Sequence, residues 1–201
     1  MCACARCKKE LTLDLHKSGI LCKCLKGYYV IGTKKCSECG KELEYDDWKR
    51  KYDMIDKFDK QNVEGRNKEI ACDFEGALQC YLKAWDISLI LFHKYNVKNI
   101  PLLENIVWSL IKLGKFREAH KYCRDLLDIT KESLPYFTSH SAITEYKLAK
   151  IEYSMGYIES ALKYMIHAYQ YLKLTHVDYP EFLSILHDTI DQLSYDLKKE
   201  P

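Results

Sequence analysis

The sequence predicts a mainly α-helical protein, in which a small zinc-bound, cysteine-rich N-terminal segment precedes about seven helices paired as stacked antiparallel hairpins. Two observations lead to this prediction. Seven of the ten cysteines fall within the first 39 residues, and long helical patterns that repeat along the chain follow them. A segment this short and poor in large apolar residues needs metal to become ordered. We therefore expect a zinc-binding segment over residues 1–45 and a helical repeat domain over residues 46–201.

Composition and charge exclude several classes of function. A formal net charge of +2 provides no large positive field for nucleic acid or a membrane surface. No apolar run approaches the roughly 18 residues of a membrane span, and no secretory signal follows Met1. The sequence predicts an intracellular protein of the cytoplasm, the nucleus or both, with reduced cysteines. Cys72, Cys80 and Cys123 lie within helical patterns and are expected to be small core residues.

One group of cysteines has the spacing of a tetrathiolate zinc site. Cys36 and Cys39 are separated by two residues, which lets both thiolates reach one ion, and Gly40 permits the tight turn after them. The second pair, Cys22 and Cys24, lies upstream with the shorter C-x-C spacing. The sequence therefore predicts structural zinc on this set: Cys22, Cys24, Cys36 and Cys39.

The first three cysteines form an incomplete set of ligands. Cys2, Cys4 and Cys7 read C-x-C-x-x-C, which supplies three ligands where a closed structural zinc site has four. The fourth is either His16 or a group from polypeptide outside this chain. The alternative for His16 is a histidine of a surface loop. We predict that these three cysteines also bind zinc.

The helical part repeats every 42 residues, because similar segments begin at positions 72, 114 and 156. Gly114–Ala119 recurs as Gly156–Ala161 and, earlier, as Cys72–Ala77. Apolar and small residues follow at the spacing of one helical face, which predicts helices over 74–88, 116–130 and 158–172. Each glycine is expected at the left-handed position that ends the preceding helix.

Other helical patterns precede these segments and complete antiparallel pairs typical of a tetratricopeptide-like repeat. We expect these helices over 46–59, 102–113, 142–155 and 180–197, with Ser139 or Ser141 as the N-cap of the third. Tyrosines along the repeats are predicted to line the core and the groove. The histidines from His93 to His187 show no ligand spacing and are expected at the surface or as satisfied core residues.

The order of the parts resembles the C-terminal half of the SET-and-MYND-domain (SMYD) family of protein-lysine methyltransferases. Cys2, Cys4 and Cys7 resemble its post-SET motif, residues 21–40 resemble a cysteine-rich insertion of some members, and residues 139–152 and 156–161 resemble its tetratricopeptide-like domain. The resemblance implies that the fourth ligand of the first zinc comes from a SET core. This sequence contains no such core, and S-adenosylmethionine is implied only for a full-length member.

Two functional hypotheses result. In the first, the chain is the post-SET and helical-repeat region of a SMYD-like protein-lysine N-methyltransferase, a zinc-stabilised scaffold that flanks the substrate cleft. Alone it is expected to be inactive, and no catalytic residue is assigned. The resemblance implies lysine-bearing protein partners, histones among them. The alternative is a freestanding tetratricopeptide-like interaction adaptor with a structural zinc knuckle.

Both hypotheses predict a protein substrate or partner peptide in the groove of the helical repeats. A third hypothesis takes the cysteine knuckles as nucleic-acid-binding, because several lysines surround them. No array of interleaved aromatic and basic residues accompanies these lysines, so the sequence argues against nucleic acid as a partner.

Overall fold

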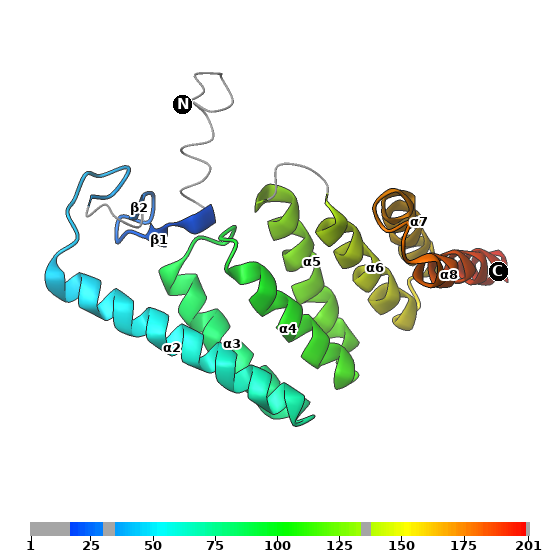
Figure 1. Ribbon diagram of the computed structural model, residues 1–201, viewed down its shortest axis with the longest axis horizontal. Coiled ribbons are helices and arrows are strands. Elements are labelled where there is room, and N and C mark those ends of the chain that lie inside the picture. Colours follow the sequence, from blue (N-terminus) through cyan, green and yellow to red (C-terminus); the bar gives the residue numbers. More distant parts are fainter. Residues whose placement is uncertain (1–16, 30–34, 134–137, 200–201) are drawn as a thin grey trace, which may run out of the picture. The chain divides into compact units, whose positions relative to one another are not determined.

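The computed structural model describes residues 17–29, 35–133 and 138–199 (Figure 1). Within these ranges it contains seven α-helices and one two-stranded antiparallel hairpin, which confirms the predicted mainly α fold. By its contacts the chain divides into two compact units, Met1–Ser109 and Leu110–Pro201. The predicted boundary at residue 45 separates a cysteine-rich segment from a helical one by composition and not by contacts, and it stays a prediction.

The elements follow one another in the order β, β and then helices only. They are β1 (Ile20–Leu21), β2 (Tyr28–Tyr29), α2 (Tyr45–Ile70), α3 (Phe74–Leu91), α4 (Asn99–Lys112), α5 (Phe116–Ser133), α6 (Ser139–Ser154), α7 (Ile158–Thr175) and α8 (Pro180–Lys199).

In the first unit, α2 and α3 form an antiparallel hairpin with a very close approach. Gly65 of α2 faces the ring of Tyr81 on α3, and a Cβ at Gly65 would lie 2.5 Å from a ring carbon. Tyr81 is fully buried, and its hydroxyl donates a hydrogen bond of 2.8 Å to Glu69. Burial is the main cause that raises the pKa of this hydroxyl, and the hydrogen bond to Glu69 raises it further. The missing side chain at Gly65 therefore sets the distance between the two helices.

Helix α2 is longer than the sequence predicts, since it ends at Ile70 and not near residue 59. The reason is that α2 buries only Phe58 and Gly65, so its second half has no apolar periodicity to detect. This half is stabilised by its packing on α3, which a sequence pattern does not reveal.

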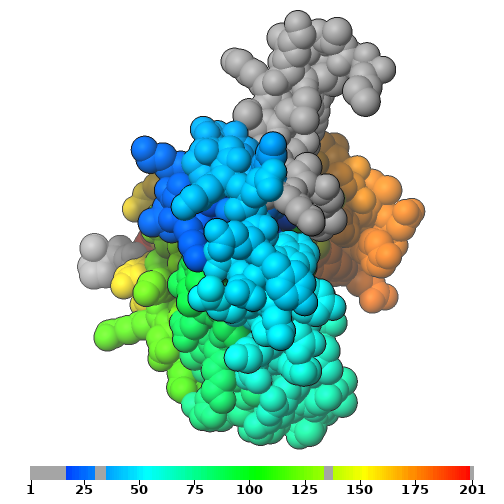
Figure 2. Space-filling model, turned by 90° about the vertical axis from the view of Figure 1, so that its left-hand side faces the viewer, coloured from blue at the N-terminus to red at the C-terminus, as the bar shows by residue number. Residues whose placement is uncertain are grey.

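The β1–β2 hairpin is joined to the loop that follows α3. The buried Asn96 donates a side-chain hydrogen bond to the carbonyl of Gly19 at 3.2 Å, and the Val97 amide donates to the Lys17 carbonyl at 2.9 Å. The surface of this unit is continuous between the hairpin segment in blue and α2 in cyan (Figure 2). The cysteine-bearing loops are thus fixed to the helices of their own unit.

In the second unit, α5 packs on α6, α6 on α7, and α7 on α8. The core of α6, α7 and α8 combines alanines with larger apolar residues: Ala142, Ala149, Ala161, Met165, Ala168, Leu172, Leu186 and Leu193. The small repeat positions Ala77, Ala119 and Ala161 are all fully buried, as expected for residues at which a neighbouring helix approaches closely.

The left-handed turns confirm the alignment of the repeats. Gly114 and Gly156 have φ values of +70° and +82°. Cys72 occupies the same repeat position and has a φ of +60°. The expectation that Cys72 is a core residue is wrong, because this turn position is exposed, whereas Cys80 and Cys123 are buried as expected.

The predicted N-cap of α6, Ser139 or Ser141, is also wrong, because both serines lie within the helix. The cap is Thr138, whose Oγ1 accepts a hydrogen bond from the Ser141 amide at 3.3 Å. Threonine and serine are both good capping residues, so composition alone does not select between adjacent candidates. The bounds of α4 and α8 differ from the predicted ones by up to three residues.

Replacing Cys72 by glycine should raise the free energy of unfolding by about 1 kcal/mol, because glycine adopts left-handed backbone without the clash of a Cβ. The matched change Gly114→Ala should lower it by a similar amount. A Cβ there would meet no atom within 4 Å, so the effect is confined to the backbone. Urea denaturation followed by circular dichroism measures both. A Cys72→Gly protein less stable than wild type would contradict this account.

Candidate functional site

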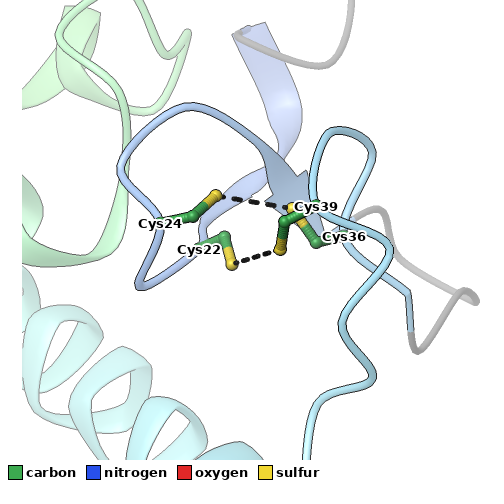
Figure 3. Close-up of side chains that lie close together, drawn as sticks. All are labelled: Cys22, Cys24, Cys36 and Cys39. Carbon is green, nitrogen blue, oxygen red and sulfur yellow. Dashed lines mark hydrogen bonds between the residues drawn. The ribbon is translucent and has the colours of Figure 1, made fainter.

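Two turns bring four cysteines of the first unit together (Figure 3). Cys22 and Cys24 follow β1, while Cys36 and Cys39 follow β2, and the four sulfur atoms lie within 4.8 Å of one another. The Sγ atoms of Cys22 and Cys39 are 3.9 Å apart, and those of Cys24 and Cys36 are 3.8 Å apart. A tetrahedral zinc with Zn–S bonds of about 2.3 Å separates its sulfurs by about 3.8 Å, so these residues fit a tetrathiolate ion.

Each turn reverses on a left-handed residue placed directly after its second cysteine. In the second turn this residue is Gly40, as predicted, with a φ of +66°. In the first turn it is Leu25, with a φ of +59°. Gly27 has a different role, since a Cβ there would collide with the sulfur of Cys36. The glycine after the first pair therefore makes space for a candidate ligand of the second pair.

The surroundings favour the thiolate form in which cysteine binds metal. Backbone hydrogen bonds from Lys26 and Gly27 lower the pKa of Cys24 to about 6. The Cys22 sulfur lies 3.2 Å from the Tyr29 hydroxyl, and burial together with this contact raises the pKa of Tyr29. The Lys51 ammonium donates a hydrogen bond of 2.7 Å to the carbonyl of β1 residue Leu21. Nearby positive charge offsets part of the charge of a thiolate cluster.

The other predicted ligands lie elsewhere. Cys2, Cys4, Cys7 and His16 fall outside the residues that the structure describes, so their role stays a prediction. Among the described residues, Cys72, Cys80 and Cys123 form no disulfide and do not join the cluster.

A hollow of about 460 Å³ in the second unit lies between α6 and α8. Its lining combines apolar and polar side chains: Lys150, Tyr153, Ser154, Met165, Ile185, Asp188, Thr189, Gln192 and Leu193. Met165 and Leu193 are fully buried, whereas Ile185 is 55% exposed and Tyr153 is 40% exposed. An apolar hollow with a few polar groups is the usual form of a recognition site.

One carboxylate joins the two walls of this groove. Asp196 of α8 accepts a hydrogen bond of 3.0 Å from the Tyr153 hydroxyl of α6 and one of 2.8 Å from the Gln192 amide. The bonds from Gln192 and Tyr153 lower the pKa of Asp196, and the same contact raises the pKa of Tyr153. The contact orients both side chains at the groove, in agreement with the predicted groove-lining role of the tyrosines.

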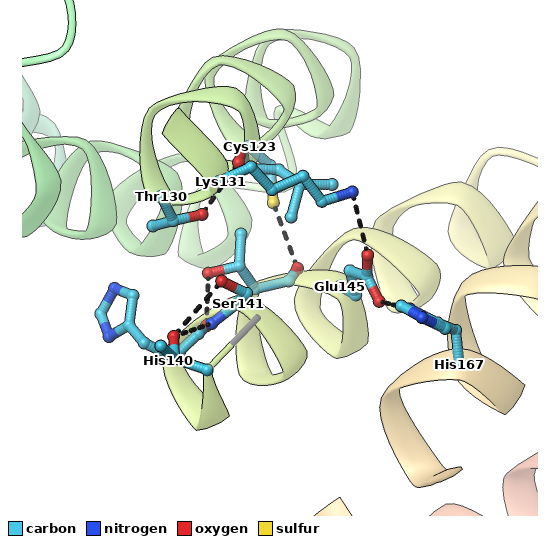
Figure 4. Close-up of polar contacts among 10 residues, drawn as sticks. Cys123, Thr130, Lys131, His140, Ser141, Glu145 and His167 are labelled. Carbon is cyan, nitrogen blue, oxygen red and sulfur yellow. Dashed lines mark hydrogen bonds and ion pairs between the residues drawn. The ribbon is translucent and has the colours of Figure 1, made fainter. Parts of the chain in front are cut away.

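Two buried glutamates of α6 were not detected from the sequence. Glu145 is 2% exposed and pairs with Lys131 of α5 at 3.2 Å and with His167 of α7 (Figure 4). Glu152 is 3% exposed and lies 3.0 Å from the His120 ring of α5. Their separation of seven residues places both on one helical face, and this spacing was the signal available. The paired histidines agree with the expected satisfied core or surface roles.

The fold and these sites define a mainly α protein built of antiparallel helix pairs with a four-cysteine centre. Solved structures with the same fold are tetratricopeptide repeat (TPR) domains. They include the TPR2AB domain of yeast Sti1 in a complex with pHSP90, with 18% identity and a TM-score of 0.50. This match covers 71% of this chain and 48% of that one. The chain therefore spans about half the length of that structure.

Two further TPR structures are matched over nearly their whole length. The N-terminal domain of stress-induced protein-1 from C. elegans is 17% identical with a TM-score of 0.52, covering 70% of this chain and 97% of that one. The first TPR of Spaghetti (RPAP3), bound to the HSP90 peptide SRMEEVD, is 18% identical with a TM-score of 0.52, covering 72% and 95%. At such identity the likeness establishes the fold alone.

Comparison of the sequence with family models finds no match, and neither does comparison with curated proteins. The methyltransferase resemblance therefore has no support from these comparisons, which support the helical repeat fold. Within the described part of the chain, none of the helices combines the length and the apolar content of a membrane span.

Glu145→Ala should lower the free energy of unfolding by about 2–3 kcal/mol, because it leaves Lys131 and His167 without their buried acceptor. Lys131→Ala is the control and should cost less than about 1 kcal/mol, since the Lys131 side chain is 47% exposed. Urea denaturation again provides the measurement. Equal effects of the two changes would show that Glu145 does not organise the packing of α5, α6 and α7.

Proposed function

We propose that this protein is a TPR-like interaction adaptor, which binds a protein segment in the groove between α6 and α8 and carries a structural zinc ion on Cys22, Cys24, Cys36 and Cys39. The observation that carries the proposal is the groove itself, whose exposed Tyr153 and Ile185 surround a buried apolar floor. Two of the similar TPR structures are complexes with HSP90 or its peptide, which supports a groove that binds peptides.

The shape and chemistry of the groove suit a peptide side chain. Burial of one large apolar side chain against Ile185 and the floor contributes about 1.5–3 kcal/mol. The polar rim, formed by Ser154, Thr189 and Gln192, offers hydrogen-bonding groups for peptide backbone. The hydrogen bonds to Asp196 hold the side chains of Tyr153 and Gln192 in place before a peptide binds. This adds affinity, because fewer side chains must be ordered on binding.

The charges of the groove do not suit an acidic peptide. Asp188 lines it and Asp196 adjoins it, against the single cation Lys150. Lys150 lies 5.5 Å from the centre of the Tyr146 ring, in a cation–π contact. The segment that binds in this groove is therefore expected to differ from the acidic SRMEEVD peptide of the RPAP3 structure.

The role proposed for zinc is structural. Four thiolates close the coordination sphere, so no position is left for water or substrate. The metal would fix the two turns relative to each other, where few large apolar residues are present: the described cluster contains Tyr29 with Leu43 against it. On this proposal residues 1–45 are the zinc-binding segment and residues 46–201 the repeat domain, and the protein acts in the cytoplasm or nucleus.

A second candidate is the C-terminal region of a SMYD-like methyltransferase. The observation that favours it is the order of parts, with cysteine turns followed by helix pairs. In this case Cys2, Cys4 and Cys7 bind a second zinc with an outside ligand, and histones or other lysine-bearing proteins are the partners. No catalytic residue is assigned to the chain in either case. Methyl transfer from labelled S-adenosylmethionine to histones by the purified chain should be absent.

Native mass spectrometry should find one tightly bound zinc ion per chain. Cys36→Ser should remove it, because a tetrathiolate site that loses one thiolate binds zinc far more weakly. The matched control Cys72→Ser should retain it, since Cys72 lies outside the cluster. Unchanged zinc content in Cys36→Ser would eliminate the proposed site. A second ion lost on Cys4→Ser would show that the first three cysteines form a closed site of their own.

Ile185→Asp should weaken binding of groove peptides by at least about tenfold, equivalent to about 1.4 kcal/mol. The peptides are those enriched from a display library of random peptides on the full chain, and fluorescence anisotropy measures their affinity. Leu174→Asp is the control, because Leu174 is an exposed apolar residue that does not line the groove. Equal affinity of both variants for every enriched peptide would exclude the groove as the binding site.

A further inference from the structure

The conformation of Leu25 is unfavourable both for its backbone and for its side chain. Its φ of +59° places a non-glycine residue in the left-handed region, where its Cβ crowds the following carbonyl oxygen. Its side chain is 75% exposed, so the leucine gains little from burial. Gly40 occupies the same position in the second cysteine turn. Glycine therefore suffices for such a turn, and a leucine held in this way indicates a role beyond folding.

Leu25 borders a hollow of about 390 Å³ between the first cysteine turn and helices α2 and α3. The lining of the hollow is mainly apolar, with Leu21, Leu25, Met54 and Ile90 among its apolar residues and Lys23 and Arg50 among its charged ones. Ile90 is 62% exposed. The hollow has the size of an ordinary ligand pocket, about 300–1,000 Å³.

The charge that the hollow presents to solvent is positive. The side chains of Lys23 and Arg50 are 70% and 73% exposed, whereas Asp47 between them is only 18% exposed. Asp47 lies 2.6 Å from Lys23 and 3.0 Å from Arg50, so both cations cover its carboxylate. Lys51 is partly buried and interacts electrostatically with Cys22, a buried residue of the lining. The accessible rim therefore suits carboxylates of a partner.

We propose that Leu25 and Ile90 form a second docking site, which takes a segment of a partner protein carrying a large apolar side chain flanked by carboxylates. The apolar side chain enters between Leu25, Met54 and Ile90, and the carboxylates pair with Lys23 and Arg50. Single-stranded nucleic acid suits the site less well, because no aromatic side chain lines the hollow for base stacking. The site shares no residue with the α6–α8 groove.

The experiment uses the full chain as bait for a display library of random peptides, with Leu25→Gly as the decisive variant. Leu25→Gly should be at least as stable as wild type, because glycine removes the backbone strain. It should nevertheless lose about tenfold or more in affinity for one class of peptide, enriched in Asp and Glu beside a large apolar residue. Arg50→Glu should weaken the same peptides, and added salt should weaken them in wild type.

Ile185→Asp is the matched control and should bind this class of peptide as wild type does. If no enriched peptide depends on Leu25, or if the dependent peptides lack acidic residues, the proposal is wrong. It is equally wrong if an oligothymidylate probe binds in a Leu25-dependent manner and the peptides do not. Should Leu25→Gly unfold the cysteine segment, Leu25→Asn replaces it, since asparagine also tolerates left-handed backbone. If enriched peptides depend on Leu25 but none depends on Ile185, the α6–α8 groove is refuted as a binding site and the Leu25 site is supported.

Discussion

The described structure depends on chain reversals made by left-handed residues. Among the described residues five have a positive φ, namely Leu25, Gly40, Cys72, Gly114 and Gly156. Two of them close the cysteine turns, and three lie between consecutive helices. In the cysteine turns the reversal directs sulfur atoms toward a common centre, and between helices it directs small residues toward a neighbour. One backbone conformation thus positions both the candidate metal centre and the helical packing.

The sequence predicts those parts of the fold in which local chemistry and packing agree. The repeat of Gly114 and Gly156, with the fully buried alanines that follow, indicates the turns and the contact positions together. The second half of α2 was missed because its helical state depends on Gly65 packing against Tyr81. A glycine within a polar stretch locally indicates the end of a helix. The continuation of α2 through Gly65 becomes evident only when the packing of the partner helix is known.

The residues of the candidate sites also fall into those that the sequence indicates and those that only the structure reveals. Spacing identifies Cys22, Cys24, Cys36 and Cys39, because ligands of one ion must be close in sequence or on facing turns. The turn residue of the first pair is Leu25, which no sequence pattern indicates, because leucine rarely adopts a left-handed backbone. Glu145 and Glu152 were missed because a glutamate ordinarily indicates a solvated face. Their burial depends on lysine and histidine partners from α5 and α7 that are distant in sequence.

The two cysteine turns provide an internal comparison that separates the requirements of folding from those of binding. Both reverse at the residue after the second cysteine, with nearly equal φ, and one has glycine where the other has leucine. The geometry of the turn is therefore achieved without a side chain, and the leucine side chain adds strain and exposed apolar surface. What it contributes is a wall of a hollow shared with Met54 and Ile90. A residue that weakens its own turn but completes a recognition surface is best explained by what occupies that surface.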